Sequence, residues 1–251
     1  MVSRYVSLLA DRLPGAAFGL VMLSLAACGP APAPSGINDP REAQNREVHE
    51  LNKSIDRALV NPASNAYGEI PGPLRQGVQN FAGNLDLPGD VVNGLLQGRP
   101  KNALDSTLRF VINSTVGLAG LFDPAKAIGI SGKTTDFGET LHVWGFAEGA
   151  YGELPLIGPS TTRDTTGRIV DAALNPLRLL LPSKEASVAT FASTASRLGD
   201  RYKFGNTVDS ILYDSADSYA QERLLYLQNR RFELGQTTNE DEQFFDPYKD
   251  N

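Results

Sequence analysis

The sequence KNALDSTLRFVINSTVGLAGLF, residues 101–122, contains the most apolar helix that the chain predicts, over residues 101–118. Its apolar residues recur at helical spacing: Leu104, Leu108, Val111, Ile112 and Val116. From Phe110 to Phe122 no residue is charged. A helix needs roughly 20 apolar residues to cross a bilayer, so this run cannot span one. Two interpretations stay open: the helix lies in one leaflet, or it is the buried core helix of a soluble protein.

Helices with one apolar side are also predicted before this segment. Asp39-Pro40-Arg41-Glu42 supplies an N-cap, a first-turn proline and an acidic third residue, so a helix begins there, and Pro62 is expected to end it. Two more helices are expected after Pro73 and Pro88. The apolar positions of the three helices are Val48, Leu51, Ile55 and Leu59; Leu74, Val78, Phe81 and Leu85; and Val91, Val92, Leu95 and Leu96.

Residues 117–167 are rich in glycine and contain three prolines, which permits only short helices and many turns. Helices resume at about 161–174, 184–203 and 207–234. No run of alternating residues predicts a strand; residues 154–157 could be extended but include Pro155. The sequence therefore predicts an all-α fold.

The N-terminus predicts a lipoprotein signal. Arg4 and Arg12 precede an uncharged apolar run at 15–27, which suits a signal-peptide core and is too short for a transmembrane helix. The run ends in Leu25-Ala26-Ala27-Cys28, which looks like the bacterial lipobox, whose cysteine sulfur receives a diacylglycerol. An ordinary secretory signal with an odd thiol is the alternative. Lipidated Cys28 would anchor the mature chain, because several acyl chains bind a membrane firmly.

Four segments are expected along the chain. Residues 1–27 are a lipoprotein signal peptide, and residues 28–37, with Pro30-Ala-Pro-Ala-Pro, are a flexible tether that carries lipidated Cys28. Residues 38–235 are a single helical domain, and residues 236–251 are an acidic disordered tail.

Composition excludes several classes of function. The 251 residues carry a net charge of −6 with scattered basic residues, which argues against binding of nucleic acid. One cysteine and two histidines, His49 and His142, argue against a metal site, and no cofactor motif is convincing. His49 is expected to be an interfacial or solvated side chain rather than a ligand.

Catalytic motifs are weak. The set that comes nearest to a hydrolase relay is His142 with Ser160 or Asp164, but Gly158-Pro159-Ser160 lacks the Gly-x-Ser-x-Gly elbow. A histidine within twenty residues of a serine is common by chance. The sequence therefore favours a protein that is not an enzyme.

Several short blocks follow one another in order between residues 39 and 174. They are Asp39-Pro40 with Glu42 and Asn45-Arg46; Asn80-Phe81 with Gly83-Asn84-Leu85 and Pro88; Val92-Asn93 with Leu96-Gln97-Gly98; Arg109-Phe110 with Asn113; Gly117 and Gly120 to Asp123; Asp136-Phe137-Gly138 with Thr140-Leu141; and Tyr151, Leu154-Pro155-Leu156, Gly158-Pro159-Ser160 and Arg163-Asp164. In these blocks and in their order the chain resembles the MlaA (VacJ) lipoprotein family.

The resemblance implies a ring-like domain of short amphipathic helices, monotopic in the inner leaflet of the outer membrane. Such a protein is lipid-anchored, faces the periplasm and lies beside a trimeric porin. Its amphipathic channel removes phospholipids misplaced in the outer leaflet and passes them to a periplasmic carrier protein, which maintains lipid asymmetry. Asn84, Asn93, Arg109 and Asn113 are the expected channel-lining residues. Alternatively Asn80 and Asn84 cap or tie turns, and Arg109 pairs with Asp105 one helical turn away.

One departure from the family concerns the first helix. The family usually carries Phe near positions 44 and 49, where this chain has Gln44 and His49, so the stripe expected to face the membrane is less apolar. Two other functions stay open beside lipid transport. One is a lipoprotein lipid hydrolase that uses Ser160 and His142, and the other is a structural adaptor that binds porin.

Overall fold

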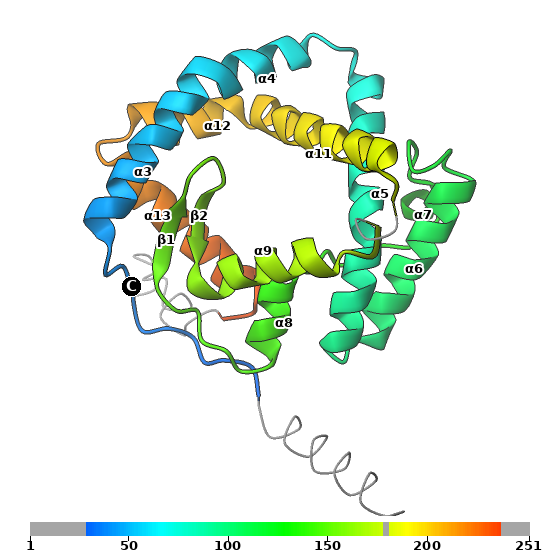
Figure 1. The fold of residues 1–251 in the computed structure, drawn as a ribbon, viewed down its shortest axis with the longest axis horizontal. Helices are drawn as coiled ribbons and strands as arrows, with labels where there is room; N and C mark the ends of the chain where they lie inside the picture. Colours follow the sequence, from blue (N-terminus) through cyan, green and yellow to red (C-terminus); the bar gives the residue numbers. More distant parts are fainter. Residues whose placement is uncertain (1–28, 178–180, 237–251) are drawn as a thin grey trace, which may run out of the picture.

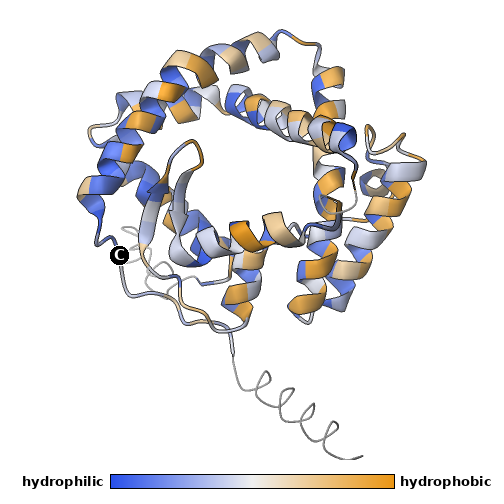
Figure 2. Cartoon of the chain, in the orientation of Figure 1, coloured by the Kyte–Doolittle hydropathy of each residue, from blue (hydrophilic) through white to orange (hydrophobic). Residues whose placement is uncertain are grey.

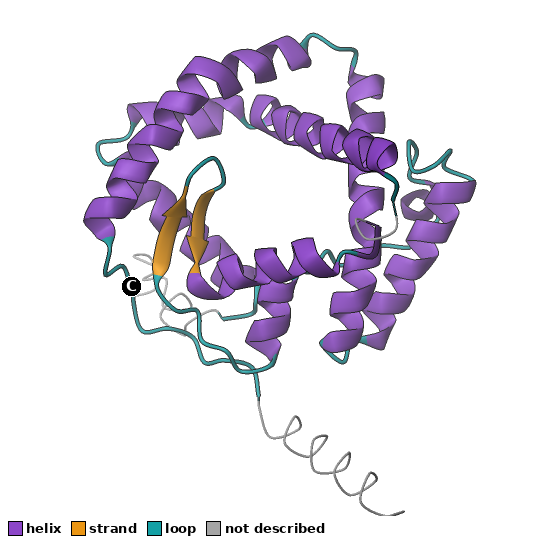
Figure 3. Ribbon diagram, viewed as in Figure 1, coloured by secondary structure: helices purple, strands orange, loops and turns teal. Residues whose placement is uncertain are grey.

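Helices arranged in a ring make up most of the molecule (Figure 1). The computed structural model describes residues 29–177 and 181–236. Among these residues, none of the helices combines the length and the apolar character that a bilayer crossing requires. The helices form the outline of the ring, and one short hairpin lies beside α3 and α13 (Figure 3). The predicted all-α class is confirmed in this architecture.

The elements follow one another in chain order. They are α3 (Glu42–Ile55), the π-helix η1 (Asp56–Val60), α4 (Asn61–Gly68), α5 (Gly72–Leu96), α6 (Pro100–Thr115), α7 (Pro124–Ala127), α8 (Phe137–Val143), β1 (Tyr151–Leu154), β2 (Gly158–Thr161), α9 (Thr162–Leu174), α11 (Ser183–Lys203), α12 (Gly205–Asp209), the π-helix η2 (Ser210–Asp214) and α13 (Ser218–Glu233).

Two prolines that the sequence predicts as helix boundaries lie within helical segments. The N–H of Asn61 bonds to the carbonyl of Asp56, five residues back, so η1 leads directly into α4 with Pro62 in its first turn. Pro88 lies inside α5, and the two helices expected around it are one helix of 25 residues. Both expected boundaries are wrong. Packing of α5 on α6 and α11 maintains the helix although Pro88 cannot donate a backbone hydrogen bond.

A two-stranded antiparallel sheet occurs where the sequence predicts no strand. β1 pairs with β2, with Tyr151 opposite Thr161 and Leu154 opposite Gly158. The intervening turn uses positive φ angles at Leu156, +65°, and Gly158, +87°. Strands of four residues are too short to show a convincing alternation, so the prediction is wrong at this hairpin.

The predicted apolar side of the first helix faces outward. Leu51 and Leu59 are 49% and 65% exposed, whereas Asn45, His49 and Asp56 are buried. In a soluble protein the apolar side of such a helix packs on the core. Across the described residues, 22 polar or charged residues are buried, against 11 apolar ones. The polarity of the fold is thus inverted relative to that of a soluble domain.

Helix α6 has the same inverted arrangement. Its apolar residues Leu104, Leu108 and Val111 are exposed, while Ser106 and Asn113 are buried. Hydrophobic positions recur along α3, α4 and α6 in Figure 2. The interpretation of residues 101–118 as the buried core helix of a soluble protein is therefore wrong, and an outer surface that contacts lipid is favoured.

The segment before α3 contacts the domain. The Ala31 N–H donates to the carbonyl of His142 at 3.0 Å, and the Arg231 guanidinium donates to the carbonyl of Gly36 at 2.7 Å. Gln236, the first residue of the expected tail, is buried and donates to the carbonyls of Ala31 and Pro32. The expected signal peptide at residues 1–27, Cys28 and residues 237–251 lie outside the described residues. The beginning of the described chain therefore packs beside the end of α13.

Candidate functional site

Two neighbouring cavities lie among α5, α9 and α11. One, of about 200 Å³, is lined mainly by polar residues: Asp86, Gly89, Asp90, Val92, Asn93, Thr134, Thr135, Phe137, Asp171 and Asn175. The other, of about 260 Å³, is lined mainly by apolar residues: Leu85, Asp86, Asn175, Leu177, Leu181, Ala186, Ala189, Thr190 and Ser193. Asp86 and Asn175 line both cavities. We name them the polar cavity and the apolar cavity after the majority of their lining residues, although each also exposes surface of the other kind. Polar and apolar contacts side by side suit a molecule with a polar group and hydrocarbon chains.

Asn93 lines the polar cavity and connects three helices. Its Nδ2 donates to Oδ1 of Asp171 on α9 at 2.9 Å, and its Oδ1 accepts from the Thr140 hydroxyl on α8 at 2.8 Å. Because the nitrogen and the oxygen of its side-chain amide both form hydrogen bonds within the protein, Asn93 fixes the arrangement of α5, α8 and α9 around the cavity.

Carboxyl groups give the polar cavity its electrostatic character. Asp90 is buried and accepts the Thr135 N–H at 3.0 Å. Burial raises the pKa of Asp90 to about 7, with a smaller contribution from the charge of Asp86, while the hydrogen bond from Thr135 acts in the opposite direction. Burial also raises the pKa of Asp171 above its usual range. Part of the Asp90 population therefore carries a proton at neutral pH.

Arg109 and Asn113 hold the turn that follows α6. Arg109 Nη2 donates to Oδ2 of Asp123 at 2.8 Å, and Asn113 Nδ2 donates to Oδ1 of the same carboxylate at 2.9 Å. Asp105 instead pairs with Lys101. The alternative pairing of Arg109 with Asp105 is therefore wrong, and both predicted lining residues stabilise the turn before α7.

Asn84 lies on α5 and contacts the end of α6. Its Nδ2 donates to the hydroxyl of Ser114 at 3.0 Å, and the backbone of Gly120 approaches so closely that an added Cβ would lie 2.7 Å from Asn84 Cβ. The structure therefore brings Asn84 to the contact between α5 and the turn after α6, at a different place from Asn93.

The residues of the alternative hydrolase interpretation do not form a relay. Ser160 is fully buried, and its hydroxyl lies 2.9 Å from that of Thr165. The Asp164 carboxylate accepts from the Tyr226 hydroxyl at 2.7 Å and from Arg230 at 3.1 Å. Burial, followed by the charge of Arg163, lowers the pKa of His142, whose Nδ1 makes no hydrogen bond with the described residues. Neither a nucleophile–base contact nor access to Ser160 is present in this arrangement.

Long-range ion pairs close the ring, and none of them is predicted by the sequence pattern. Arg46 on α3 donates twice to the Asp217 carboxylate before α13, at 2.9 Å in each contact. Arg223 on α13 pairs with Asp39, whose carboxylate also accepts from the Tyr219 hydroxyl. These partners are 171 to 184 residues apart. No local spacing could have identified them.

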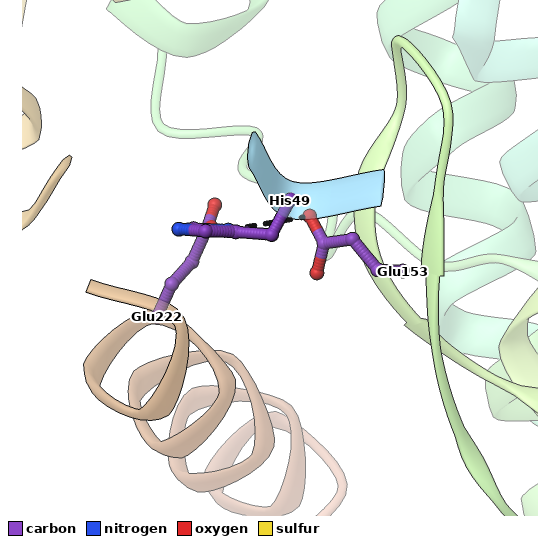
Figure 4. Close-up of side chains that lie close together, drawn as sticks. All are labelled: His49, Glu153 and Glu222. Atoms are coloured by element: carbon purple, nitrogen blue, oxygen red, sulfur yellow. Dashed lines mark ion pairs between the residues drawn. The ribbon is translucent and has the colours of Figure 1, made fainter. Parts of the chain in front are cut away.

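His49 is buried between α3, β1 and α13, and only 1% of its surface is exposed. Its Nε2 lies 2.9 Å from the hydroxyl of Ser218. Its Nδ1 lies 3.0 Å from Oε2 of Glu222 and 3.8 Å from Oε1 of Glu153 (Figure 4). Burial favours the neutral imidazole, but the two glutamates outweigh it and raise the pKa of His49 to about 9. The expectation of an interfacial or solvated His49 is wrong, because the polar side of α3 faces inward.

Known proteins resemble most of this chain. The family model of the MlaA lipoprotein matches residues 37–233. The Escherichia coli protein named "Intermembrane phospholipid transport system lipoprotein MlaA" is 32% identical over 78% of each chain. A Rickettsia bellii protein is 34% identical over 73% of this chain and 72% of its own. A solved structure described as "Structural basis for maintenance of bacterial outer membrane lipid asymmetry" superposes with a TM-score of 0.66 at 27% identity, covering 78% of this chain and 98% of that one.

Proposed function

Because the chain belongs to the MlaA lipoprotein family, we propose that it transports phospholipid between the membranes of the bacterial envelope. In this function it removes phospholipids misplaced in the outer leaflet of the outer membrane and passes them to a periplasmic carrier protein. Lipid asymmetry of the outer membrane is thereby maintained. The names of the relatives and the overall similarity to the solved structure support this proposal.

The observation that carries the proposal is the inverted polarity of the ring. Apolar residues on α3, η1 and α6, among them Leu51, Leu59 and Leu104, are exposed, whereas polar residues of the same helical segments are buried. At roughly 25 cal/mol per Å², the exposed apolar surface favours contact with acyl chains over contact with water. A ring of amphipathic helices, none of which within the described residues could cross the bilayer, can then lie within one leaflet.

The two cavities among α5, α9 and α11 supply the interior that a phospholipid needs. The cavity that contains Asn93 and Asp90 offers polar groups to a headgroup, whose transfer into an apolar environment is costly. The neighbouring cavity, with Leu177, Leu181 and Ala189, offers apolar contact to the acyl chains. In this account no bond of the lipid is made or broken.

The anchor and the partners of the protein are part of the proposal. Cys28 carries the lipid that holds the chain in the inner leaflet of the outer membrane, facing the periplasm. The helical ring lies beside a trimeric porin. The packing of residues 31–36 against the end of α13 keeps the attachment point close to the ring. A Cys28→Ala protein is expected to leave the membrane in salt-washed envelopes, and firm attachment of this variant would instead assign the anchoring to the helices.

Deletion of the gene tests transport against its two rivals. We expect phospholipid in the outer leaflet of the deletion strain to rise and to return to normal with the wild-type copy. Unchanged surface phospholipid, together with altered recovery of porin, would support the adaptor. Release of fatty acid from labelled phospholipid by the purified protein, abolished in Ser160→Ala, would support the hydrolase; the burial of Ser160 argues against that result.

A further inference from the structure

Three side chains from distant segments converge where the ring closes. His49 comes from α3, Glu153 from β1 and Glu222 from α13, and one ligand atom of each lies within 4.8 Å of the other two. Figure 4 shows the imidazole between the two carboxylates. We propose that these residues form a structural site for one divalent transition-metal ion, with zinc as the best-suited metal. The site is independent of the proposed lipid transport.

The spacing of the three donors approaches that of a tetrahedral zinc site. His49 Nδ1 lies 3.0 Å from Glu222 Oε2 and 3.8 Å from Glu153 Oε1. With metal–ligand distances of about 2.1 Å, tetrahedral ligands are separated by about 3.4 Å. These two separations lie on either side of this value, and the two glutamate oxygens lie within 4.8 Å of each other. Small rotations of the glutamate side chains would therefore bring all three atoms into the coordination distance.

One neutral tautomer of His49 leaves the nitrogen that faces the glutamates available to a metal ion. Its Nε2 lies 2.9 Å from the Ser218 hydroxyl, which also accepts a hydrogen bond from Lys53 Nζ at 3.1 Å. An N–H at Nε2 places the free lone pair on Nδ1. Nδ1 is buried and makes no hydrogen bond of acceptable geometry with the described residues, although Glu222 is near. In that tautomer, a buried Nδ1 lone pair that faces two carboxylates is the arrangement that a metal ion would satisfy, in place of the proton that these carboxylates favour in the metal-free protein.

Other residues hold the Glu153 carboxylate in place. The Tyr151 hydroxyl donates to its Oε2 at 2.6 Å, and Asn52 Nδ2 donates to its Oε1 at 3.2 Å. The N–H of Glu153 donates to Asn45 Oδ1 at 3.1 Å, which fixes β1 against α3. Such hydrogen bonds to a ligand orient it and commonly account for 10- to 100-fold of metal affinity.

Charge and access also suit a divalent cation. With a neutral imidazole, the two glutamates concentrate two negative charges at a site where Glu153 is buried. One divalent ion neutralises both charges, whereas a proton on His49 neutralises only one. All three residues also line a cavity of about 240 Å³, which offers an entry path and room for a water molecule as the fourth ligand.

The donor set selects the class of metal. Magnesium and calcium prefer sites made only of oxygen ligands, whereas one imidazole with two carboxylates suits zinc and similar transition metals. A bound ion would connect the first described helix, the hairpin and the last helix. Because the three ligands are far apart in the unfolded chain, binding would favour the folded state.

Calorimetric titration of the mature lipoprotein in detergent tests the site. After treatment with EDTA and removal of the chelator, we expect ZnCl₂ to bind at one ion per chain, and Tyr151→Phe to weaken binding by about 10- to 100-fold. Glu222→Gln and His49→Gln are expected to weaken it at least as much. Glu50→Gln is the matched control, because Glu50 lies on the same helix and its exposed carboxylate pairs with Lys53. This variant is expected to bind like the wild type.

A second readout covers variants that fold poorly. Zinc is expected to raise the unfolding midpoint of the wild type and of Glu50→Gln, and to leave that of His49→Gln unchanged. The proposal is overturned if the wild type shows no saturable binding of one zinc ion, or if Glu222→Gln, Tyr151→Phe and Glu50→Gln all bind it equally. Neither measurement depends on lipid transport, so failure of the site and failure of the transport proposal are distinguishable.

Discussion

Arg201 binds the Asp56 carboxylate through two hydrogen bonds, from Nε to Oδ1 at 2.9 Å and from Nη2 to Oδ2 at 2.8 Å. Asp56 begins η1, directly after α3, and Arg201 lies near the end of α11, so the contact joins segments 145 residues apart. The side chain of Asp56 is 12% exposed and that of Arg201 is 10% exposed. A paired geometry of this kind, shielded from water, is far more sensitive to disruption than a surface ion pair.

Loss of the Arg201 side chain is expected to destabilise the ring strongly. Arg201→Ala leaves the buried Asp56 charge without its main partner, which should lower the free energy of unfolding by roughly 3–5 kcal/mol. Chemical denaturation in detergent would measure the change. Lys101→Ala is the control, because Lys101 is 88% exposed in its pair with Asp105 and its loss should cost less than about 1 kcal/mol. Equal effects of the two substitutions would contradict this assignment.

Asp90→Asn is expected to stabilise the protein at alkaline pH. An asparagine oxygen can still accept the Thr135 N–H, but it removes the buried charge whose unfavourable environment raises the pKa of Asp90 to about 7. The raised value means that the ionised carboxylate opposes folding above pH 7. We expect a gain of roughly 1–3 kcal/mol at pH 8.5 that shrinks as the pH falls towards 4. A pH-independent difference between the two proteins would show that Asp90 does not titrate in this range.

His49 is expected to make the stability of the metal-free protein depend on pH. Glu153 and Glu222 raise the pKa of His49 in the folded state to about 9, above the ordinary value of 6.5. The stabilisation that protonated His49 gains from the two glutamates is therefore complete below pH 6.5 and is lost as the pH rises to 9. In EDTA, the difference in unfolding free energy between wild type and His49→Gln should be larger at pH 6 than at pH 9.5. An equal difference at both pH values would refute the raised pKa.

Gly120 and Gly98 provide a matched pair of glycine substitutions. Both have positive φ, +93° and +67°, but a Cβ on Gly120 would lie 2.7 Å from Asn84, whereas one on Gly98 would meet nothing within 4 Å. Gly98→Ala should cost roughly 1 kcal/mol from backbone strain alone. Gly120→Ala should cost about 1–3 kcal/mol more, because Asn84 and its bond to Ser114 must also move. Thermal unfolding of both variants would show whether the turn after α6 packs as tightly as described.

The position of most helices could be predicted from the sequence, but the direction of their apolar sides could not. The spacing of Leu51, Ile55 and Leu59 is the same whether the residues face a protein core or a lipid leaflet, since helical period does not distinguish the two environments. Pro62 and Pro88 were misleading because a π-helix and tertiary packing compensate for the missing hydrogen bonds.

The candidate sites were less predictable than the helices. Asn93 was identified as a polar residue among apolar ones, and it does line the polar cavity. Arg109 and Asn113 share one partner, Asp123, which lies outside their own helix. The environment of His49 depends on Glu153 and Glu222, more than 100 positions away in the sequence. Contacts between such distant segments arise from closure of the ring and leave no local pattern in the sequence.

Passage of lipid through the interior of the ring is tested most directly by filling one of its cavities. Ala189 lines the apolar cavity, while its neighbour Val188 is 57% exposed on the same helix. Ala189→Trp and Val188→Trp, expressed at equal levels in the deletion strain, would be compared by the amount of phospholipid in the outer leaflet. If lipid passes through this cavity, Val188→Trp restores lipid asymmetry and Ala189→Trp, which fills the cavity, does not. Full restoration by Ala189→Trp would contradict transport through this cavity.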